Sequence, residues 1–239
     1  MNNDPLAEQT PTVSPYVYVS NNPINSIDPT GMSEESVKDD YKLSKNGKVE
    51  LIKKTNDNFD RIYNDDKSKN IKIQKGIAEQ MTNPAKTGEG NNGKKYHSST
   101  GEFNKFENDY FKLFKFAADN TPIEFSLNIF KDKGKNLMTL ATYNDSGEAP
   151  GWGNQGISIS NVVMQYHSHP GIRTDIGVEK YSMGVGYSLG NSDYGHAYNG
   201  KWVQPEYVYF PNSKRLWRFN KEGVGFIKNI NNSLDLKDY

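Results

Sequence analysis

VVMQYHSHPG, at residues 162–171, joins an apolar run to a pair of histidines and then to a chain break. The run 162–166 has the length and apolar character of a buried strand, which the Pro-Gly pair would end. Side chains two residues apart in a strand point to the same face, so His167 and His169 are predicted to lie side by side. Such a pair of imidazoles suits a divalent metal that takes nitrogen ligands, zinc first.

A zinc site built on two histidines needs a further protein ligand, because catalytic zinc usually has three and keeps one position for water. Four downstream side chains could supply it: Asp175, Glu179, Asp193 and His196. Asp193 is preferred, since Ser192-Asp193 could open a short helix whose first turn would aim and stabilise a carboxylate. His196 is the second choice, and Asp175 and Glu179 are expected on a mobile loop.

A hydrolytic metal site also needs a base, and Glu124 is the best candidate. It lies in TPIEFSLNIF, at residues 121–130, whose apolar residues predict a strand that is buried on at least one face. A carboxylate in such a strand is paired, at an edge, or functional. The alternative role for Glu124 is an exposed ion pair with a lysine on an edge strand.

In chain order, Glu124, the His167-x-His169-Pro segment and Asp193 resemble the signature of the JAMM (JAB-type) metalloproteases. The resemblance implies that His167, His169 and Asp193 hold zinc. It implies that Glu124, on a separate strand, activates water against an amide or isopeptide carbonyl of a protein substrate. It also implies an α+β fold, with a cytidine-deaminase-like mixed β-sheet flanked by helices.

The serine of the signature is displaced in this chain. The family usually has a serine three residues before the metal aspartate, where it helps to hold the oxyanion. Gly190 occupies that position here, with Ser188 and Ser192 on either side. The spacer between His169 and Asp193 is also longer than the usual pattern. Ser188 and Ser192 are therefore both candidate catalytic residues, with purely structural roles as the alternative.

A second resemblance lies at residues 4–32, DPLAEQTPTVSPYVYVSNNPINSIDPTGM, which look like the end of an Rhs-repeat core. The residues that match its junction motif are Pro23, Asp28, Pro29, Gly31 and Met32. In that family the junction precedes a variable toxin, and JAB-like domains are among the toxin types. The resemblance implies a secreted polymorphic-toxin effector that acts in the cytoplasm of a target cell. Its implied partners are the Rhs shell of the parent protein and a cognate immunity protein.

Three segments are predicted along the chain: an Rhs-core remnant at 1–32, a β-rich spacer and linker at 33–97, and a JAB-like toxin domain at 98–239. Short strands are expected in the spacer at 48–52, 61–63 and 71–73, and the Gly-, Asn-, Lys- and Ser-rich stretch 82–102 is interpreted as linker. In the toxin domain, aromatic residues at three-to-four-residue steps predict a helix at 103–117. Strands are expected at about 121–131, 135–144, 206–210, 214–219 and 223–229.

Composition limits the function classes. The 239 residues include 29 Lys and Arg and 29 Asp and Glu, so no charge excess favours nucleic acid as a partner. The absence of cysteine excludes disulfides and thiolate ligands. No apolar run is long enough for a membrane span, and the N-terminus has no signal-peptide pattern. Export is therefore expected within a larger carrier or through a dedicated machine.

Two other functions remain open. A metal-dependent nuclease toxin could use the two histidines together with Asp193 and His196. A degenerate JAMM-like module could bind a partner without catalysis. Trp152, in the Gly-rich loop 147–156 before the histidine strand, could form a wall for the substrate, although packing is the preferred role.

Overall fold

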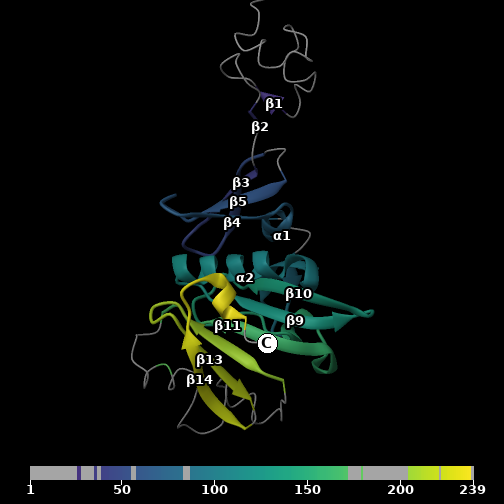
Figure 1. Cartoon of the computed structure of the whole chain (residues 1–239). Helices are drawn as coiled ribbons and strands as arrows, with labels where there is room; N and C mark the ends of the chain where they lie inside the picture. The colour runs from purple at the N-terminus through teal and green to yellow at the C-terminus, as the bar shows by residue number, and fades with distance from the viewer. Residues whose placement is uncertain are drawn as a thin grey trace, which may run out of the picture.

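The computed structural model describes residues 39–54, 58–82, 87–171, 204–220 and 222–237, together with Glu179 and the two-residue strands β1 (Ser26–Ile27) and β2 (Glu35–Ser36). β1 and β2 pair with each other, and the other strands form a four-stranded and an eight-stranded sheet. Helix α2 (Phe103–Asn120) lies between these two larger sheets (Figure 1). The expected α+β class with a mixed sheet is confirmed. No helix within the described ranges is long and apolar enough to cross a membrane.

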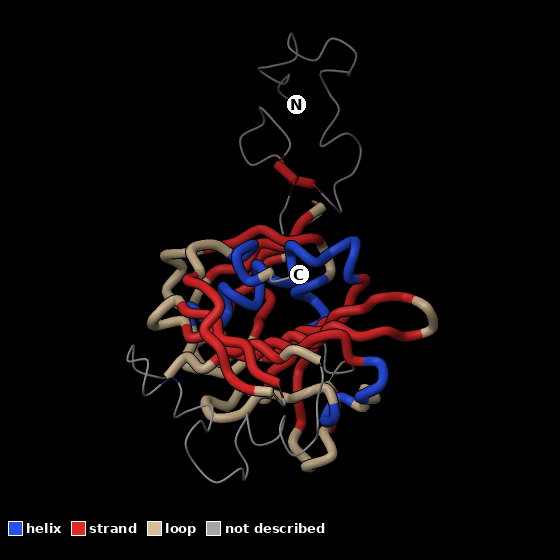
Figure 2. Tube along the Cα trace, turned by 60° about the horizontal axis from the view of Figure 1, so that its bottom comes forward, coloured by secondary structure: helices blue, strands red, loops and turns tan. Residues whose placement is uncertain are grey.

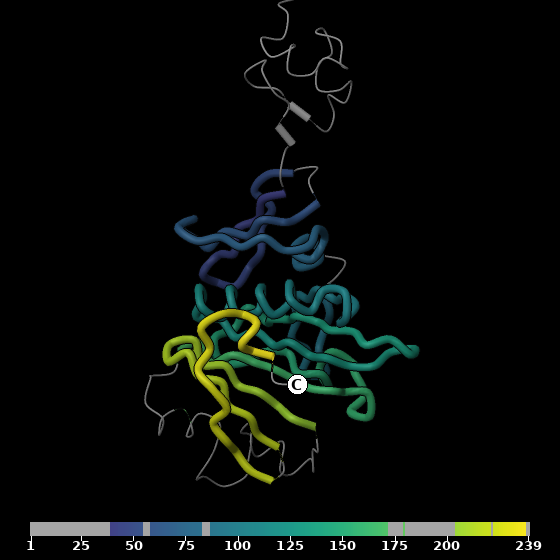
Figure 3. Tube along the Cα trace, viewed as in Figure 1, coloured from purple at the N-terminus to yellow at the C-terminus, as the bar shows by residue number. Residues whose placement is uncertain are grey.

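The large sheet runs in the order β14-β13-β12-β11-β9-β10-β8-β7. Its strands are β7 (Gly88–Glu89), β8 (Lys95–Glu102), β9 (Ser126–Asp132), β10 (Lys135–Thr142), β11 (Val162–Ser168), β12 (Glu206–Phe210), β13 (Arg215–Asn220) and β14 (Gly223–Asn229). β11 pairs antiparallel with β9 and parallel with β12, which makes the sheet mixed. The C-terminal strands therefore lie beside the histidine strand, as the change from green to yellow in Figure 3 shows.

The two faces of the large sheet have different neighbours. Tyr166 on β11 packs edge-on against Phe111 of α2, with ring centroids 5.2 Å apart, and stacks on Tyr207 at 4.6 Å. Because successive strand residues alternate in direction, His167 points away from α2. On that opposite face, a second apolar cluster gathers side chains of β12 and β13: Val208, Phe210, Trp217 and Phe219. The histidines therefore share a face with this smaller cluster.

Helix α2 follows from the predicted aromatic periodicity and extends to Asn120. Its buried residues include Tyr110 and Phe114, which the period predicts, and also Phe111 and Phe116. An amphipathic helix on one sheet would bury a single stripe. Burial on more than one side follows here because α2 packs between two sheets. Two hydrogen bonds from Thr121, through its N–H and its Oγ1, cap the helix at the Ala117 carbonyl.

The small sheet has the order β4-β3-β5-β6 and includes all the short strands expected in this part of the chain. Its elements are β3 (Asp39–Leu43), β4 (Val49–Lys53), β5 (Phe59–Tyr63) and β6 (Asn70–Gln74), followed by helix α1 (Ile77–Thr82). Tyr41, Ile62 and Ile73 are buried in the same apolar core as α2. The small sheet is therefore part of the packed body of the protein.

The linker predicted at 82–102 is wrong from residue 88 onward. Residues 88–89 and 95–102 form β7 and β8, joined by a turn in which Gly93 has a φ of +75°. Residues 97–102 of β8 pair with β10. Its sequence, KYHSSTGE, is polar on both faces and has no apolar alternation. Hydrogen bonds satisfy its polar side chains. Ser99 is hydrogen-bonded to the Tyr110 hydroxyl at 2.9 Å, and Thr100 donates to Thr139 at 3.0 Å.

The hairpin of β9 and β10 projects from the body of the protein and ends in the turn at Lys133-Gly134 (Figure 2). Short 3₁₀ helices complete the described fold: η4 (Gly153–Gln155), η5 (Ile159–Asn161) and η6 (Ser233–Leu236). The first two lie in the connection from β10 to the histidine strand, so they belong to the surroundings of the candidate site.

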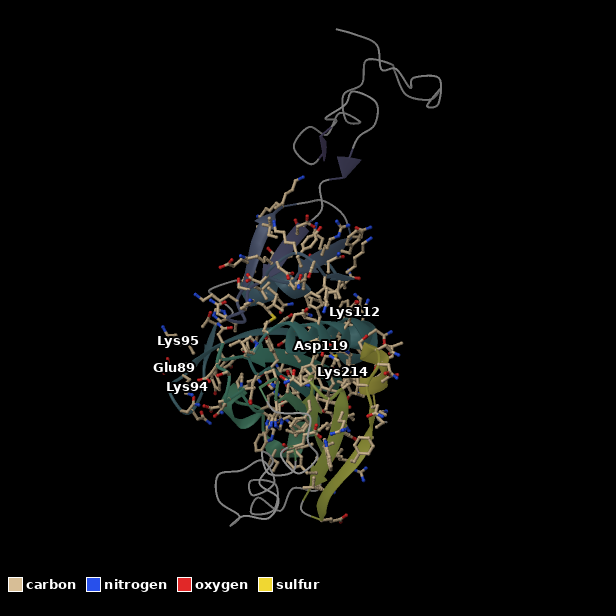
Figure 4. All side chains as sticks on the ribbon, turned by 90° about the vertical axis from the view of Figure 1, so that its left-hand side faces the viewer. Glu89, Lys94, Lys95, Lys112, Asp119 and Lys214 are labelled. Carbon is tan, nitrogen blue, oxygen red and sulfur yellow. The ribbon has the colours of Figure 1, made fainter. Side chains whose placement is uncertain are left out.

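Asp119 ties α2 to the strand beside the histidines. Its carboxylate accepts hydrogen bonds from the Tyr209 hydroxyl at 2.8 Å, from Nζ of Lys214 at 2.8 Å and from Nζ of Lys115 (Figure 4). Burial and the neighbouring Asp119 charge raise the pKa of Tyr209, which therefore stays protonated as a donor. The carbonyl of Tyr209 accepts the N–H of His169, so this residue connects the helix to the candidate site.

Candidate active site

The two histidines lie side by side, as the strand period predicts. Their ring centroids are 5.0 Å apart and their planes are inclined by 50°. His167 belongs to β11, and His169 follows its last residue. The N–H of His169 donates to the Tyr209 carbonyl at 2.9 Å, which extends the pairing with β12 past the end of β11. Both side chains are buried, with 7% and 9% of their surfaces exposed.

Aromatic edges surround the histidine pair. His169 meets Phe210 edge-on with centroids 5.3 Å apart, and His167 meets Phe219 at 6.2 Å. These rings belong to the smaller apolar cluster of the sheet. An apolar shell of this kind limits access of solvent and lowers the local dielectric constant, which strengthens the electrostatic interactions of a bound ion.

Glu124 comes to this pair from a distant part of the sequence. Its Oε1 lies 3.9 Å from Nε2 of His169, and 12% of its side chain is exposed. The structure thus brings together Glu124, His167 and His169, three of the residues proposed from the sequence. The expected arrangement of a carboxylate beside a histidine pair is present in the described part of the chain.

The expected position of Glu124 within a strand is wrong. β9 begins at Ser126, and Glu124 lies two residues before it. The Glu124 N–H donates to the Asp145 carbonyl at 2.9 Å, and its own carbonyl accepts from Thr142 Oγ1 at 2.9 Å. These bonds replace strand pairing because the register of β9 with β10 ends at Ser126 and Ala141. The Glu124 backbone is therefore fixed by residues at and just beyond the end of β10.

Ser168 connects the two halves of the site. Its N–H donates to the Phe125 carbonyl and its Oγ accepts from the Phe125 N–H, each at 3.1 Å. Ser168 is fully buried and lies between the two histidines, and Phe125 follows Glu124 directly. The His-x-His pattern of the sequence gives Ser168 no role. The signal that could have found it is a small polar residue that closes a strand of otherwise large side chains.

Glu179 corrects another expectation. It was expected on a mobile loop, as one of the possible metal ligands. In the structure it is fully buried and accepts hydrogen bonds from Trp217 Nε1 at 2.7 Å and from Arg215 Nη1 at 3.1 Å. Both carboxylate oxygens thus contact β13. Trp217 and Arg215 hold Glu179 in place because a buried carboxylate must be paired.

The loop before β11 lies against the same face of the sheet. The Pro150 carbonyl accepts hydrogen bonds from Ser126 Oγ at 2.5 Å and from Gln155 Nε2 at 2.7 Å. A Cβ added at Gly151 would lie 3.8 Å from the side-chain amide of Gln165. The loop therefore covers β9 and β11 close to the histidines. Trp152 is half-buried in it, and its role as a packing residue stays a prediction.

The remaining site residues lie outside the described part of the chain. They are Asp193, Ser188, Ser192, Asp175 and His196. Among the residues that are described, no three His, Asp or Glu side chains could hold a metal ion together. Asp193 as the third ligand, and Ser188 or Ser192 as the oxyanion residue, therefore stay predictions.

The two histidines fit a zinc ion in chemistry and spacing. Two imidazoles that bind one zinc ion tetrahedrally, with Zn–N bonds of ~2.1 Å, have ring centroids roughly 5 Å apart. The observed separation is 5.0 Å. The donor set is also appropriate, because imidazole nitrogen is a preferred zinc ligand. Glu124 adds a carboxylate whose Oε1 lies 3.9 Å from Nε2 of His169. His167 and His169 would hold the ion, with Asp193 as the expected third ligand.

Comparison with known families agrees with this geometry. Residues 102–198 match the model of the family described as JAB-like toxin 1. This JAB-like segment contains every proposed site residue, from Glu124 to Asp193. It ends before β12, β13 and β14, which nevertheless belong to the same sheet. No curated protein and no solved structure matched the chain.

Proposed function

We propose that this chain is a toxin whose JAB-like segment is a zinc-dependent peptidase or isopeptidase. The observation that carries the proposal is the position of Glu124, 3.9 Å from His169 and beside a buried pair of histidines. The similarity of residues 102–198 to a JAB-like toxin supports it independently. Both lines of support concern the same residues.

The proposed chemistry divides between the ion and the protein. Zinc, when bound, lowers the pKa of water and polarises the scissile carbonyl. Glu124 accepts the proton of the attacking water at its carboxylate and then returns that proton to the leaving amine nitrogen. The Ser168–Phe125 hydrogen bonds keep Glu124 at the correct distance from the histidines. Ser188 or Ser192 would hold the oxyanion.

The biological setting belongs to the same proposal. The residues at 4–32 that resemble an Rhs junction support a toxin carried within a larger Rhs protein and delivered into the cytoplasm of a target cell. A delivered toxin of this family implies a cognate immunity protein that protects the producing cell. The balanced charge of the chain gives no electrostatic reason to expect a nucleic-acid substrate.

The test uses zinc-loaded protein, a peptide library read by mass spectrometry, and a nucleic-acid substrate in parallel. Wild type should cleave peptides, and Glu124→Gln should lose activity by ~10²–10⁴-fold while keeping its fold. Glu148→Gln is the matched control, because Glu148 is a surface carboxylate paired with Lys94. Degraded nucleic acid with intact peptides would instead identify a nuclease. Bound zinc without cleavage of either substrate would identify a binding module.

A further inference from the structure

A row of buried polar side chains crosses the large sheet next to the histidines. Asn128 on β9 is directly opposite Gln165 on β11, and Gln165 is directly opposite Glu206 on β12. Their exposed fractions are 0%, 8% and 6%. Because directly opposite residues of neighbouring strands share a face, these three side chains form one line across the sheet.

This polar row, Asn128, Gln165 and Glu206, lies on the same face as the histidines. His167 is directly opposite Ser126, and these residues are two positions from Gln165 and Asn128 along their strands. Residues two apart in a strand share a face and are separated by ~7 Å. A substrate at the histidines therefore reaches the polar row within the length of about two amino-acid residues.

Asn128 has unused hydrogen-bonding capacity. Neither its Oδ1 nor its Nδ2 has a hydrogen-bond partner, although both atoms are inaccessible to solvent. The Oε1 atom of Gln165, directly across from it, is in the same condition. Most buried polar side-chain atoms are paired, and an unpaired donor and acceptor in one buried amide is unfavourable for folding alone. A ligand that both accepts and donates would satisfy these groups.

The loop at 150–155 covers these unpaired amide groups beside the site. The Ser126–Pro150 hydrogen bond holds the loop against β9, and a Cβ added at Gly151 would lie 3.8 Å from the side-chain amide of Gln165. Gly151 offers no side chain to that row. The polar row thus lies beneath this loop and next to the histidines.

We propose that Asn128 and Gln165 bind an amide group of the substrate within about two residues of the bond that is cleaved. An amide offers a carbonyl that can accept from Asn128 Nδ2 and an N–H that can donate to Asn128 Oδ1 or Gln165 Oε1. That amide comes from the peptide backbone or from an Asn or Gln side chain. The inference rests on the proposed peptidase function, because it assigns a specificity contact to that site.

Binding measured on metal-free protein tests the inference separately from catalysis. The probes are N-acetyl-glutamine N-methylamide and N-acetyl-methionine N-methylamide, which share backbone amides and have side chains of similar length. They are titrated by NMR against wild type, Asn128→Leu and Gln165→Met. The control is Thr139→Val, because Thr139 is directly opposite Asn128 on β10 and is already paired with Thr100.

Asn128→Leu and Gln165→Met should each weaken probe binding by about tenfold or more, the effect of one lost hydrogen bond in a closed site. Asn128→Leu should also melt at a higher temperature than wild type, because it removes an unsatisfied buried amide. Gln165→Met reports independently should the first variant fail to fold. Thr139→Val should leave probe binding unchanged.

The two probes distinguish the source of the amide. If the two variants weaken binding of the glutamine probe alone, Asn128 and Gln165 bind a side-chain carboxamide. If they weaken binding of both probes equally, these residues bind a backbone amide. Titrations in which neither Asn128→Leu nor Gln165→Met differs from wild type overturn the inference, and a buried water then satisfies Asn128. If the wild type binds the probes but cleaves no peptide, the proposed function is rejected, and the binding role of Asn128 and Gln165 stands.

Discussion

Ser168 and Phe125 exchange two hydrogen bonds, each 3.1 Å long, between the histidine strand and the segment that carries Glu124. One bond uses only backbone atoms, and the other uses the serine hydroxyl as the acceptor. Because Ser168 lies between His167 and His169, this contact fixes the distance from the carboxylate to the histidine pair. Ser168 thus links the histidine pair directly to the segment that carries Glu124.

Replacing Ser168 with Ala should destabilise the protein and loosen the site. The variant leaves the buried Phe125 N–H without its acceptor, which costs about 1–3 kcal/mol of unfolding free energy. Urea unfolding measures that loss, and zinc titration measures the site. Ser99→Ala is the control. Ser99 is a buried serine on β8, away from the histidines, and its hydroxyl is hydrogen-bonded to Tyr110 of α2. Equal zinc affinity in both variants would show that Ser168 is structural only.

Replacing Glu179 with Gln should reduce stability without removing zinc. The amide oxygen can still accept from Trp217, but the ion pair with Arg215 is lost. Arg215 is partly exposed, so the expected loss of unfolding free energy is about 1–2 kcal/mol. Zinc content per folded chain should equal that of wild type. A folded Glu179→Gln protein that no longer binds zinc would make Glu179 a ligand, contrary to its hydrogen bonds with Arg215 and Trp217 of β13.

The stability of the small sheet should fall as the pH rises through about 6. Burial raises the pKa of Asp60 to about 6, although hydrogen bonds from the N–H groups of Ala78 and Gly76 oppose the shift. The unfolded value is about 3.9, so the folded state favours the protonated form. The resulting stabilisation is complete below about pH 3.9 and is lost as the pH rises through about 6.

Asp60→Asn tests this dependence, because an amide oxygen can still accept from the two N–H groups without carrying a charge. The variant should gain stability relative to wild type between pH 4.5 and 7.5, by at most about 3 kcal/mol. Thermal melts at both pH values measure the difference. Parallel pH profiles for the two proteins would contradict the assignment to Asp60.

Local patterns in the sequence predicted much of the fold. The period of two placed His167 and His169 on one face, and the aromatic period of 103–117 predicted α2. Both patterns reflect the periodic burial of side chains within one element, which a sequence records directly. β8 was missed because its polar side chains are satisfied by Tyr110 and Thr139, and such pairing leaves no apolar alternation.

The parts of the site that depend on distant contacts were less predictable. Glu124 lies beside His169, as expected for a base in the same site. Its place before β9 depends on hydrogen bonds with Thr142 and Asp145 that no local pattern records. The anchoring of Glu179 by β13 likewise depends on residues far along the chain. Ser168 has a role only because Phe125 meets it in space.

Metal content tests the central claim most directly. Zinc is measured by elemental mass spectrometry, per folded chain, in wild type, Glu124→Gln and His169→Ala after reconstitution and removal of free metal. Roughly one zinc ion per chain is expected in wild type and in Glu124→Gln, with loss of zinc in His169→Ala, because histidine is a ligand and Glu124 is the base. No zinc in wild type, or equal zinc in His169→Ala, would contradict the account.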